Sequence, residues 1–249
     1  MLGFITDYGY KDVYAGILKI VAKRVCPKSD VIDVTHGITP FDVLEGAVAT
    51  LVTVPHLREG DVLVVVVDPG VGSEREAIAA KVGNRYLVGP NNGVLWLAAE
   101  EYGVEKVVKI EKKLVPFSSY TFHGRDLFAP AGAFLDCGGK LEELGKETKL
   151  KPLDLKLVRE VKENKLEASV VYVDGFGNVM TWARELPFEI GQEVKVNGKR
   201  ARVVRTFSEV KPKELAVYIN SFGYVEVAQY MGNASKVLGL KPGDLVVIE

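Results

Sequence analysis

Three side chains with complementary chemistry lie beside glycines in the first half of the chain: Asp68, Arg75 and His123. Asp68 and Arg75 enclose the stretch DPGVGSER, a glycine-rich turn that can aim a carboxylate and a guanidinium at one point. The stretch lacks the third glycine of a dinucleotide fingerprint, and a predicted strand rather than a helix follows it. His123 lies in TFHGRD, where Gly124 allows a sharp backbone turn. These three residues are candidates for acid–base chemistry.

Asp7 and Asp68 both follow predicted strands closely. Open α/β sheets bind ligands outside the carboxyl ends of their strands, so both carboxylates are candidate site residues. Aspartate at such positions also forms turns and caps helices, and that structural alternative stays open. We interpret His36, which follows a strand, either as a packing residue or as one that supports a site residue from behind, and His56 as a surface-loop residue. The histidines show no HxH or HxxxH spacing, so they do not predict a metal site.

Three short segments of the second half combine amide, carboxylate and aromatic side chains: VDGFGNV, INSFGY and QYMGNAS. Asp, Asn and Gly are common in hairpin turns, so each segment could be an ordinary turn. The same combination of polar and aromatic groups also suits the binding of a nucleoside. The candidate ligand residues in these segments are Asp174, Phe176, Asn178, Ser221, Phe222 and Asn233.

The elements that position the first set of residues alternate between strands and helices, which is typical of βαβ units and a mainly parallel sheet. The run DVLVVVV at 61–67 predicts a strand buried on both faces. Strands are expected at 1–6, 30–34, 61–67, 77–81 and 86–88, and helices at 13–25, 40–54, 94–102 and 127–136. The helix at 40–54 is expected to begin near Pro40, because proline is tolerated in a first turn.

The pattern changes beyond residue 150 to short strands separated by Gly, Asn, Pro and Lys turns, with one helical stretch at 234–238. This predicts a small all-β, barrel-like domain. The charged segment KETKLKPLDLKLVREVKENK is interpreted as a solvated connection. We therefore expect an α/β domain at 1–156 and a β-barrel domain at 157–249.

The composition of the 249 residues is that of a globular protein, with 47% hydrophobic and 26% charged residues. The 32 basic and 33 acidic side chains nearly cancel, which argues against nucleic acid or an anionic membrane as the partner and favours a small molecule. No apolar run approaches the roughly 18 residues of a membrane span, and the start MLGFITDYG has no leader pattern. We expect a cytoplasmic protein, with Cys26 and Cys137 as buried free thiols.

Taken together, eight segments resemble, in order and spacing, the S-adenosylmethionine hydroxide adenosyltransferase family, which is related to the adenosyl fluorinases and chlorinases. They are FITDYGYKDVYAG, DVTHGITPFDVLEGA, VVDPGVGSER, GPNNG, TFHGRDLFAP, VDGFGNVMT, YINSFGY and GNAS. The resemblance implies a Rossmann-like, three-layer N-terminal α/β domain and a C-terminal β-barrel. It also implies a homotrimer, or a dimer of trimers, whose sites lie between one subunit's N-terminal domain and a neighbour's C-terminal domain.

The resemblance assigns roles in the hydrolysis of S-adenosylmethionine to adenosine and methionine. It implies that Asp68, Arg75 and His123 act together on a water molecule and that Asp7 binds the ribose diol. The other implied substrate contacts are Asp12, Val13, Tyr14, Phe41, Phe122, Gly124, Asp174, Phe176, Asn178, Ser221, Phe222, Asn233 and Ala234. No metal or other cofactor is expected, because the sulfonium is already an activated leaving group.

The sequence departs from the halogenases of this group at several points. It has His123 and Gly124 where they have Tyr and Ser, Asp68 where they have Tyr, and no extra loop before PNNG. The halide pocket is therefore not reproduced. Phe222 also replaces an Arg that lies near the methionine carboxylate in the halogenases, so that contact is not carried over.

Two alternative functions follow from the same residues. Aspartates at strand ends are also found in metal-dependent phosphohydrolases and nucleosidases, which release phosphate or free adenine. The small number of titratable groups is also compatible with a non-catalytic nucleoside-binding protein. Such a protein would bind adenosine without turnover.

Overall fold

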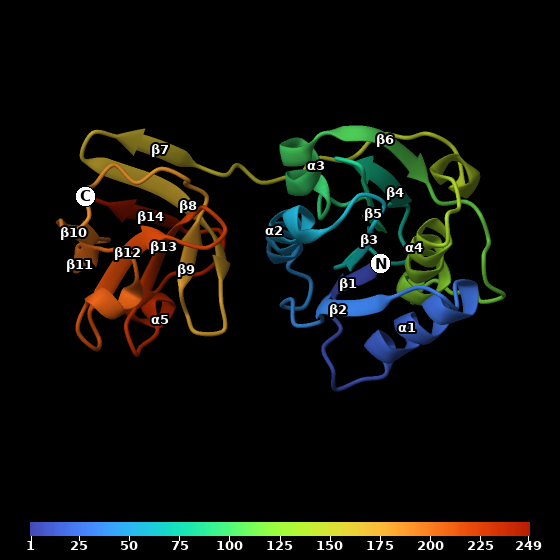
Figure 1. Ribbon diagram of the computed structural model, residues 1–249, viewed down its shortest axis with the longest axis horizontal. Coiled ribbons are helices and arrows are strands. Elements are labelled where there is room, and N and C mark those ends of the chain that lie inside the picture. Colours follow the sequence, from blue (N-terminus) through green and yellow to red (C-terminus); the bar gives the residue numbers. More distant parts are fainter. The chain divides into compact units, whose positions relative to one another are not determined.

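The computed structural model describes all residues 1–249, which form two compact units: Met1–Asp154, here unit 1, and Leu155–Glu249, here unit 2. Figure 1 shows the elements of each unit along the chain. Unit 1 is a mixed α/β structure with a mostly parallel sheet, and unit 2 contains a closed β-barrel. The predicted fold class is confirmed.

The sheet of unit 1 has the strand order β2-β1-β3-β5-β4-β6. Neighbouring strands among β2, β1, β3 and β5 pair in parallel, whereas β4 is antiparallel to both β5 and β6. Every residue of β1 and β3 is buried, as the apolar run at 61–67 predicts. The strands are β1 (Leu2–Thr6), β2 (Val31–Thr35), β3 (Val62–Val66), β4 (Ala77–Val82), β5 (Arg85–Pro90) and β6 (Val104–Lys109).

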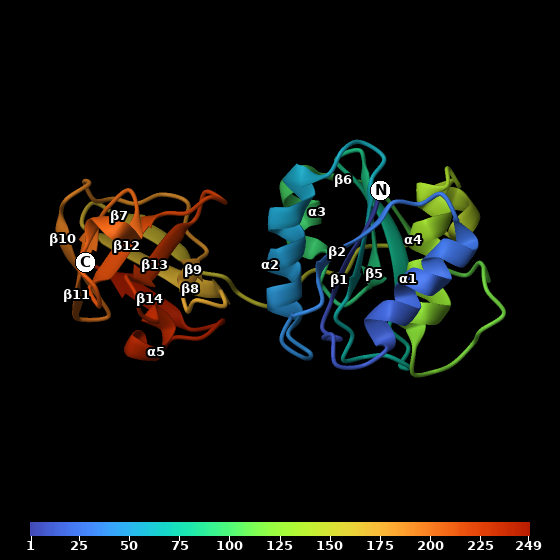
Figure 2. The same cartoon turned by 60° about the horizontal axis from the view of Figure 1, so that its bottom comes forward.

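Helices cover both faces of this sheet and complete three layers. Figure 2 shows α1 (Tyr14–Val25) and α4 (Ala129–Asp136) on one face, and α2 (Val43–Thr53) and α3 (Trp96–Tyr102) on the other. Each face has its own apolar core, one containing Phe4 and Phe128 and the other Ile5 and Leu95. Short helical turns lie at η1 (Val54–His56), η2 (Gly124–Phe128, a π-helical turn) and η3 (Leu141–Leu144).

Two local expectations need correction. The helix predicted from Pro40 begins at Val43, because the Asp42 side chain accepts a hydrogen bond from the Glu45 backbone N–H at 2.9 Å and caps the first turn. Pro40 therefore lies outside the helix. Strand β6 was not expected, since only part of it is buried and its alternation of apolar and charged residues is short.

Unit 2 is a barrel of seven strands. The ring runs β14-β10-β11-β12-β13-β9-β8 and is closed by antiparallel pairing of β14 with β8, while β7 extends the sheet beside β8. The predicted helix is present as α5 (Ala234–Leu238), and a 3₁₀ turn, η4, covers Phe207–Glu209. The strands are β7 (Arg159–Lys162), β8 (Lys165–Val173), β9 (Val179–Thr181), β10 (Glu193–Val196), β11 (Lys199–Val203), β12 (Leu215–Ile219), β13 (Val225–Gln229) and β14 (Leu245–Ile248).

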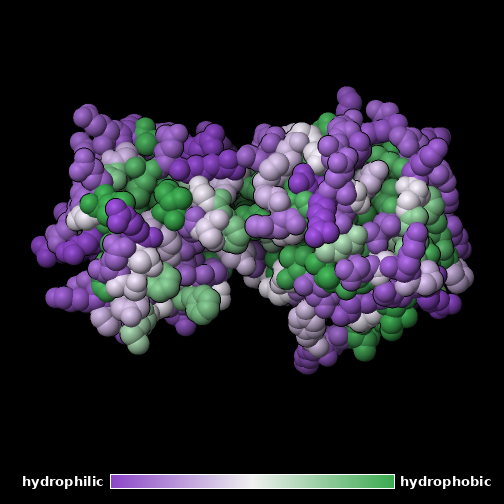
Figure 3. All heavy atoms as spheres, in the orientation of Figure 1, coloured by the Kyte–Doolittle hydropathy of each residue, from purple (hydrophilic) through white to green (hydrophobic).

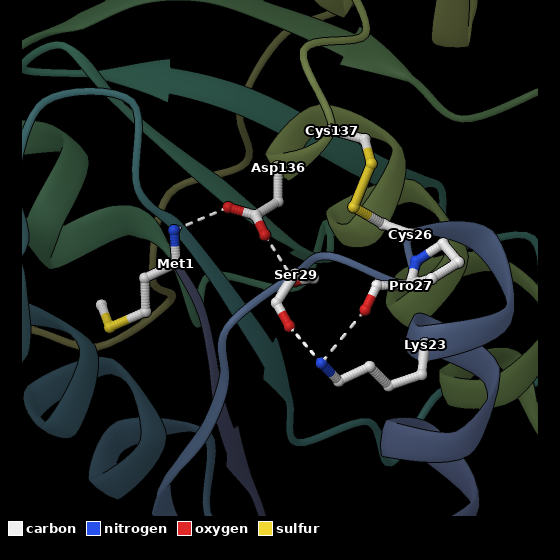
Figure 4. The surroundings of a disulfide bond; sticks show 7 residues. All are labelled: Met1, Lys23, Cys26, Pro27, Ser29, Asp136 and Cys137. Carbon is white, nitrogen blue, oxygen red and sulfur yellow. Dashed lines mark hydrogen bonds and ion pairs between the residues drawn. A yellow bond between two sulfur atoms is a disulfide. The ribbon is translucent and has the colours of Figure 1, made fainter.

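The two cysteines form a disulfide, so the expectation of free thiols was wrong (Figure 4). Cys26 directly follows α1 and Cys137 directly follows α4, and these helices pack side by side on one face of the sheet. The packing brings the two Cα atoms to 5.8 Å although 111 positions separate them in sequence. Beside the disulfide, Asp136 accepts hydrogen bonds from the Met1 ammonium and the Ser29 hydroxyl.

The visible surface of each unit is mostly hydrophilic, with smaller apolar patches between polar side chains (Figure 3). Several aromatic side chains are nevertheless exposed, among them Phe41 and Tyr14 in unit 1 and Phe176 and Phe222 in unit 2. No helix has the length and apolar character needed to cross a membrane.

Candidate active site

The first candidate site lies at the switch point of the unit 1 sheet, where the chain leaves β1 and β3 in different directions. Asp7 directly follows β1, and Asp68 lies two residues beyond β3. A cavity of about 260 Å³ opens there, at the place where open α/β sheets bind ligands. Its lining residues are Asp7, Tyr8, Asp12, Tyr14, Pro40, Phe41, Asp68, Val71, Thr121 and Gly124.

Asp68 and Arg75 form a nearly buried, two-point ion pair. Arg75 Nε donates to Asp68 Oδ1 at 2.8 Å, and Arg75 Nη2 donates to Asp68 Oδ2. Their side chains are 6% and 10% exposed, respectively. A two-point pair of this kind fixes the plane of the carboxylate as well as its charge. The third nitrogen, Arg75 Nη1, is buried and has no hydrogen-bond partner within the protein, so it is a donor available to an oxygen ligand.

His123 contacts this pair through one ring nitrogen. Arg75 Nη2 lies 2.7 Å from His123 Nδ1. Because a guanidinium can only donate, Nδ1 must be the acceptor, and the ring is neutral with its proton on Nε2. Burial lowers the pKa of His123, and the Arg75 guanidinium lowers it further, against the opposing effect of the Asp68 and Asp126 carboxylates. Both the bond and the charges therefore favour the neutral imidazole.

Two glycines allow the loops that carry these residues to approach closely. Gly72 has φ +81°, and a Cβ there would lie 2.6 Å from the Tyr120 carbonyl oxygen. A Cβ on Gly124 would lie 2.6 Å from the Tyr8 hydroxyl. Larger residues at either position would push the loops apart. The glycines thus bring the DPGVGSER turn against the segment that bears His123.

Asp7 is held by an unusual backbone conformation at Phe41. The Phe41 N–H donates to Asp7 Oδ2 at 2.9 Å, and Phe41 has φ +69°, a sparsely populated region for a residue with a side chain. Burial raises the pKa of Asp7, and the hydrogen bond from Phe41 only partly offsets this. Asp7 keeps further acceptor positions on its carboxylate oxygens for a ligand.

An adjoining cavity of about 370 Å³ shares Tyr8, Tyr14 and Thr121 with the first and adds Phe122. The other lining residues are Ser119 and Arg125. Asp126 fixes this segment, because it accepts hydrogen bonds from the Ser119 N–H at 2.7 Å and from Arg125 Nε at 2.6 Å.

Unit 2 contains a larger cavity of about 770 Å³ that gathers most of its candidate residues. Asp174, Phe176, Asn178, Ser221 and Phe222 all line it. Its remaining lining residues are Arg205, Thr206, Phe207, Tyr218, Ile219, Asn220, Glu226, Ala228, Gln229, Tyr230, Met231 and Gly232.

Asp174 also has a structural role within its loop, as the turn alternative predicted. Its Oδ1 accepts from the backbone N–H groups of Phe176 and Asn178 at 2.9 and 2.8 Å, and its Oδ2 accepts from Asn178 Nδ2 at 2.9 Å. The loop therefore presents the exposed Phe176 ring from a fixed base. One acid thus shapes the turn that carries two other candidate ligands.

Some predicted residues do not line these cavities. Val13 is 68% exposed at the start of α1, and Ala234 is fully buried. Asn233 caps α5 by accepting from the Lys236 N–H at 2.7 Å. Arg75 and His123 lie beside Asp68 without lining the 260 Å³ cavity themselves.

Sequence reasoning missed several lining residues. Tyr8 had a usable signal, because it lies next to Asp7 in TDYG immediately after a strand. Phe207, Tyr218 and Glu226 had none, since barrel closure alone brings them beside Asp174. Tyr218 donates to Glu226 at 2.6 Å, which makes this cavity wall partly acidic.

The remaining histidines have the places expected of them. His36 is buried, with Nδ1 2.7 Å from the Thr6 hydroxyl and Nε2 3.0 Å from Asp33 Oδ1. His56 is exposed in η1. No group of three or more His, Cys, Asp or Glu side chains is arranged to hold a metal ion.

Comparison with known proteins finds close relatives over the whole chain. An (R)-S-adenosyl-L-methionine hydrolase of Salinispora arenicola is 43% identical over 184 residues, which cover 72% of this chain and 70% of the relative. A solved structure described as an uncharacterized conserved protein from Thermotoga maritima aligns over 100% of both chains with a TM-score of 0.94 and 39% identity. A fluorinase of an Actinoplanes species is more distant, at 27% identity over 172 residues, 59% of this chain and 57% of the relative.

Both halves of the chain also match family domains. Residues 2–145 match the SAM hydroxide adenosyltransferase N-terminal domain, and residues 168–247 match the SAM hydroxide adenosyltransferase C-terminal domain. The order and extent of these matches agree with the resemblance of the eight sequence segments. The chain belongs to the SAM hydroxide adenosyltransferase family.

Proposed function

We propose that this protein hydrolyses S-adenosyl-L-methionine to adenosine and L-methionine. The observation that carries the proposal is the linked set Asp68, Arg75 and His123 beside a cavity at the sheet's switch point. Relatives at up to 43% identity are named (R)-S-adenosyl-L-methionine hydrolase, which supports the same substrate and, by extension, the same epimer at sulfur.

The reaction is a displacement at C5′ of the adenosyl group. The water oxygen forms a bond to C5′ while the C5′–S bond breaks. The electron pair of the C5′–S bond stays on sulfur, which becomes the neutral thioether of methionine. Water is a very weak acid and a weak nucleophile unless it loses a proton during the attack. Asp68 accepts this proton, because it is the one of the three residues that lines the cavity.

Arg75 and His123 act on Asp68 and on the water rather than as proton acceptors. Arg75 holds both Asp68 oxygens, and its unpartnered Nη1 is a suitable donor for the attacking oxygen or a substrate oxygen. His123 has its only unprotonated nitrogen occupied by Arg75, which supports a positioning role. This gives His123 a narrower role than the acid–base chemistry for which its residue type made it a candidate.

The energetic contributions decide which part of the site matters most. General-base assistance typically accelerates a reaction by roughly 10² to 10⁴. Correct placement of two reactants can lower the barrier by about 7–11 kcal/mol, more than the 3–5 kcal/mol to which that assistance corresponds. The groups that align the nucleoside are therefore at least as important as Asp68.

We propose that Asp7 binds the ribose diol. Its carboxylate lines the same cavity as Asp68, and Phe41 fixes one of its oxygens. We propose that Asp12, Tyr14, Phe41 and Gly124 contact the substrate in this cavity, and we retain Val13 as a predicted contact from the resemblance alone.

The remaining parts of the substrate are assigned to the cavity in unit 2. We propose a homotrimer, or a dimer of trimers, in which this cavity comes from a neighbouring subunit. The exposed aromatic rings Phe41 and Tyr14 at one cavity and Phe176 and Phe222 at the other support an assembly that covers them. A cytoplasmic location is likewise proposed.

Incubation with S-adenosylmethionine in isotopically labelled water tests the function. The expected products are adenosine with heavy oxygen at the 5′ position and unlabelled methionine, with turnover lost in Asp68→Asn. Free adenine would indicate a nucleosidase instead. Adenosine binding with no turnover would indicate a non-catalytic binding protein.

A further inference from the structure

Three aromatic rings form a compact cluster at the boundary of the adjoining 260 Å³ and 370 Å³ cavities of unit 1. The ring centroids of Tyr8 and Tyr14 lie 5.8 Å apart, those of Tyr8 and Phe122 lie 6.0 Å apart, and those of Tyr14 and Phe122 lie 5.2 Å apart. Tyr8 and Tyr14 line both cavities, and Phe122 lines the second. We call these three residues the aromatic wall.

Core packing accounts for only part of the aromatic wall, because Tyr8 and Phe122 pack against the core that contains Phe4 and Phe128 while Tyr14 does not. Tyr14 remains 47% exposed, and Tyr8 and Phe122 are only partly buried. The Tyr8 hydroxyl lies against Gly124, and both residues line the same cavity as Asp68. The rings therefore present surface to a ligand at the place where the proposed reaction occurs.

The charges around the wall favour a cationic ligand. Asp7, Asp12 and Asp68 line the same cavity as Tyr8 and Tyr14, and no Lys or Arg is among its lining residues. Arg75 is paired with Asp68, and Arg125 is paired with Asp126. Arg125 itself lies over the Phe122 ring, 5.3 Å from its centroid. The ring system is thus already used as a cation-binding surface on one side.

We propose that the aromatic wall of Tyr8, Tyr14 and Phe122 binds the sulfonium of the substrate and selects it over a neutral thioether. The inference rests on the proposed function, which supplies a cationic sulfur one bond from the carbon under attack. Aromatic ring faces attract cations within about 6 Å of the centroid. In a cavity of about 260 Å³ a sulfur bonded to the reacting carbon lies close to the rings that line it.

The interaction has a defined kinetic meaning. The positive charge on sulfur disappears as the C5′–S bond breaks, so the wall binds the substrate more strongly than the transition state or the thioether product. Its contribution appears in binding and in product release rather than in the chemical step. Removing one ring should therefore weaken the binding of the sulfonium while a neutral analogue is affected much less.

The test compares S-adenosylmethionine with S-adenosylhomocysteine, which carries a neutral thioether. Dissociation constants for both ligands are measured by calorimetry in an Asp68→Asn background, which slows turnover by roughly 10²- to 10⁴-fold. This background is used alone and combined with Tyr14→Leu, Tyr14→Phe or Phe122→Leu. The two ligands also differ by one methyl group, so their dissociation constants are not compared directly. The quantity compared is the fold-change that each substitution causes in the dissociation constant of each ligand. Tyr10→Leu is the matched control, since Tyr10 is an exposed tyrosine of the same loop that lines neither cavity.

The expected result is that Tyr14→Leu and Phe122→Leu weaken sulfonium binding by roughly 2- to 30-fold and thioether binding by much less. Tyr14→Phe, which keeps a ring face, and Tyr10→Leu should preserve the ratio of the two constants. Equal weakening of both ligands, or no change in either, would overturn the proposal, because the rings would then act only through shape. Turnover of the unmodified protein is measured separately, so a failure of the proposed hydrolysis is distinguished from a failure of the aromatic wall.

Discussion

Replacing His123 by Asn or by Leu separates a positioning role from a proton-accepting one. In the structure, Nδ1 of His123 accepts a hydrogen bond from Arg75 Nη2 at 2.7 Å. The side-chain oxygen of Asn lies as many bonds from the backbone as Nδ1, so it can accept the same hydrogen bond. Leu fills a similar volume but accepts nothing.

The size of the effect follows from the state of Arg75. Nη1 of Arg75 is already buried without a partner, and His123→Leu would leave an Nη2 hydrogen without an acceptor as well. An unsatisfied buried donor costs about 1–3 kcal/mol, which corresponds to roughly 5- to 140-fold if the loss falls on catalysis. If His123 were instead the base, both variants would lose roughly 10²- to 10⁴-fold alike.

The assay is the rate of adenosine release as a function of substrate and pH. We expect kcat/KM to fall in the order unmodified protein, His123→Asn, His123→Leu. The pKa of His123 is lowered, so the imidazole stays neutral at neutral pH, and activity should decline only below its ordinary value of about 6.5 as protonation removes the Nδ1 acceptor. The loss of activity at acid pH that is caused by protonation of His123 should be absent in His123→Asn. An Asn variant as inactive as the Leu variant would refute the positioning role.

Three further outcomes are expected. Replacing Cys26 and Cys137 by Ser should lower the free energy of unfolding by about 4.8 kcal/mol, because the unfolded chain gains loop entropy across their 111-residue separation. A loss of less than about 1 kcal/mol in a denaturant titration would contradict this. Asp68→Asn should lower kcat by roughly 10²- to 10⁴-fold, while calorimetry should still detect adenosine binding. A variant with the kcat of the unmodified protein would exclude Asp68 as the base. The pKa of Asp7 is raised, so its carboxylate protonates on the acid side at a higher pH than an ordinary Asp. KM should therefore rise as the pH falls, and Asp7→Asn should remove this dependence of KM on pH. Steady-state kinetics of both proteins over the acid pH range measure it.

Local sequence patterns predict most elements of the α/β unit and give the order of the chemical motifs. Continuous apolar residues at 61–67 are buried on both faces of β3, and the helix expected at 234–238 is present as α5. These features depend on local composition, which acts through residues that are near one another in the chain. The placement of Asp7 and Asp68 at strand ends also follows from sequence, because parallel strands end at one edge of the sheet.

The packing of whole elements sets which distant groups meet and in which direction their hydrogen bonds run. Cys26 and Cys137 form a bond because α1 and α4 pack on the same face of the sheet, across 111 positions of sequence. The neutral state of His123 follows from Arg75, 48 positions away, which occupies its Nδ1. Tyr8 faces Gly124 for the same reason: contact geometry depends on the packing of whole elements, and no local pattern of residue types encodes it.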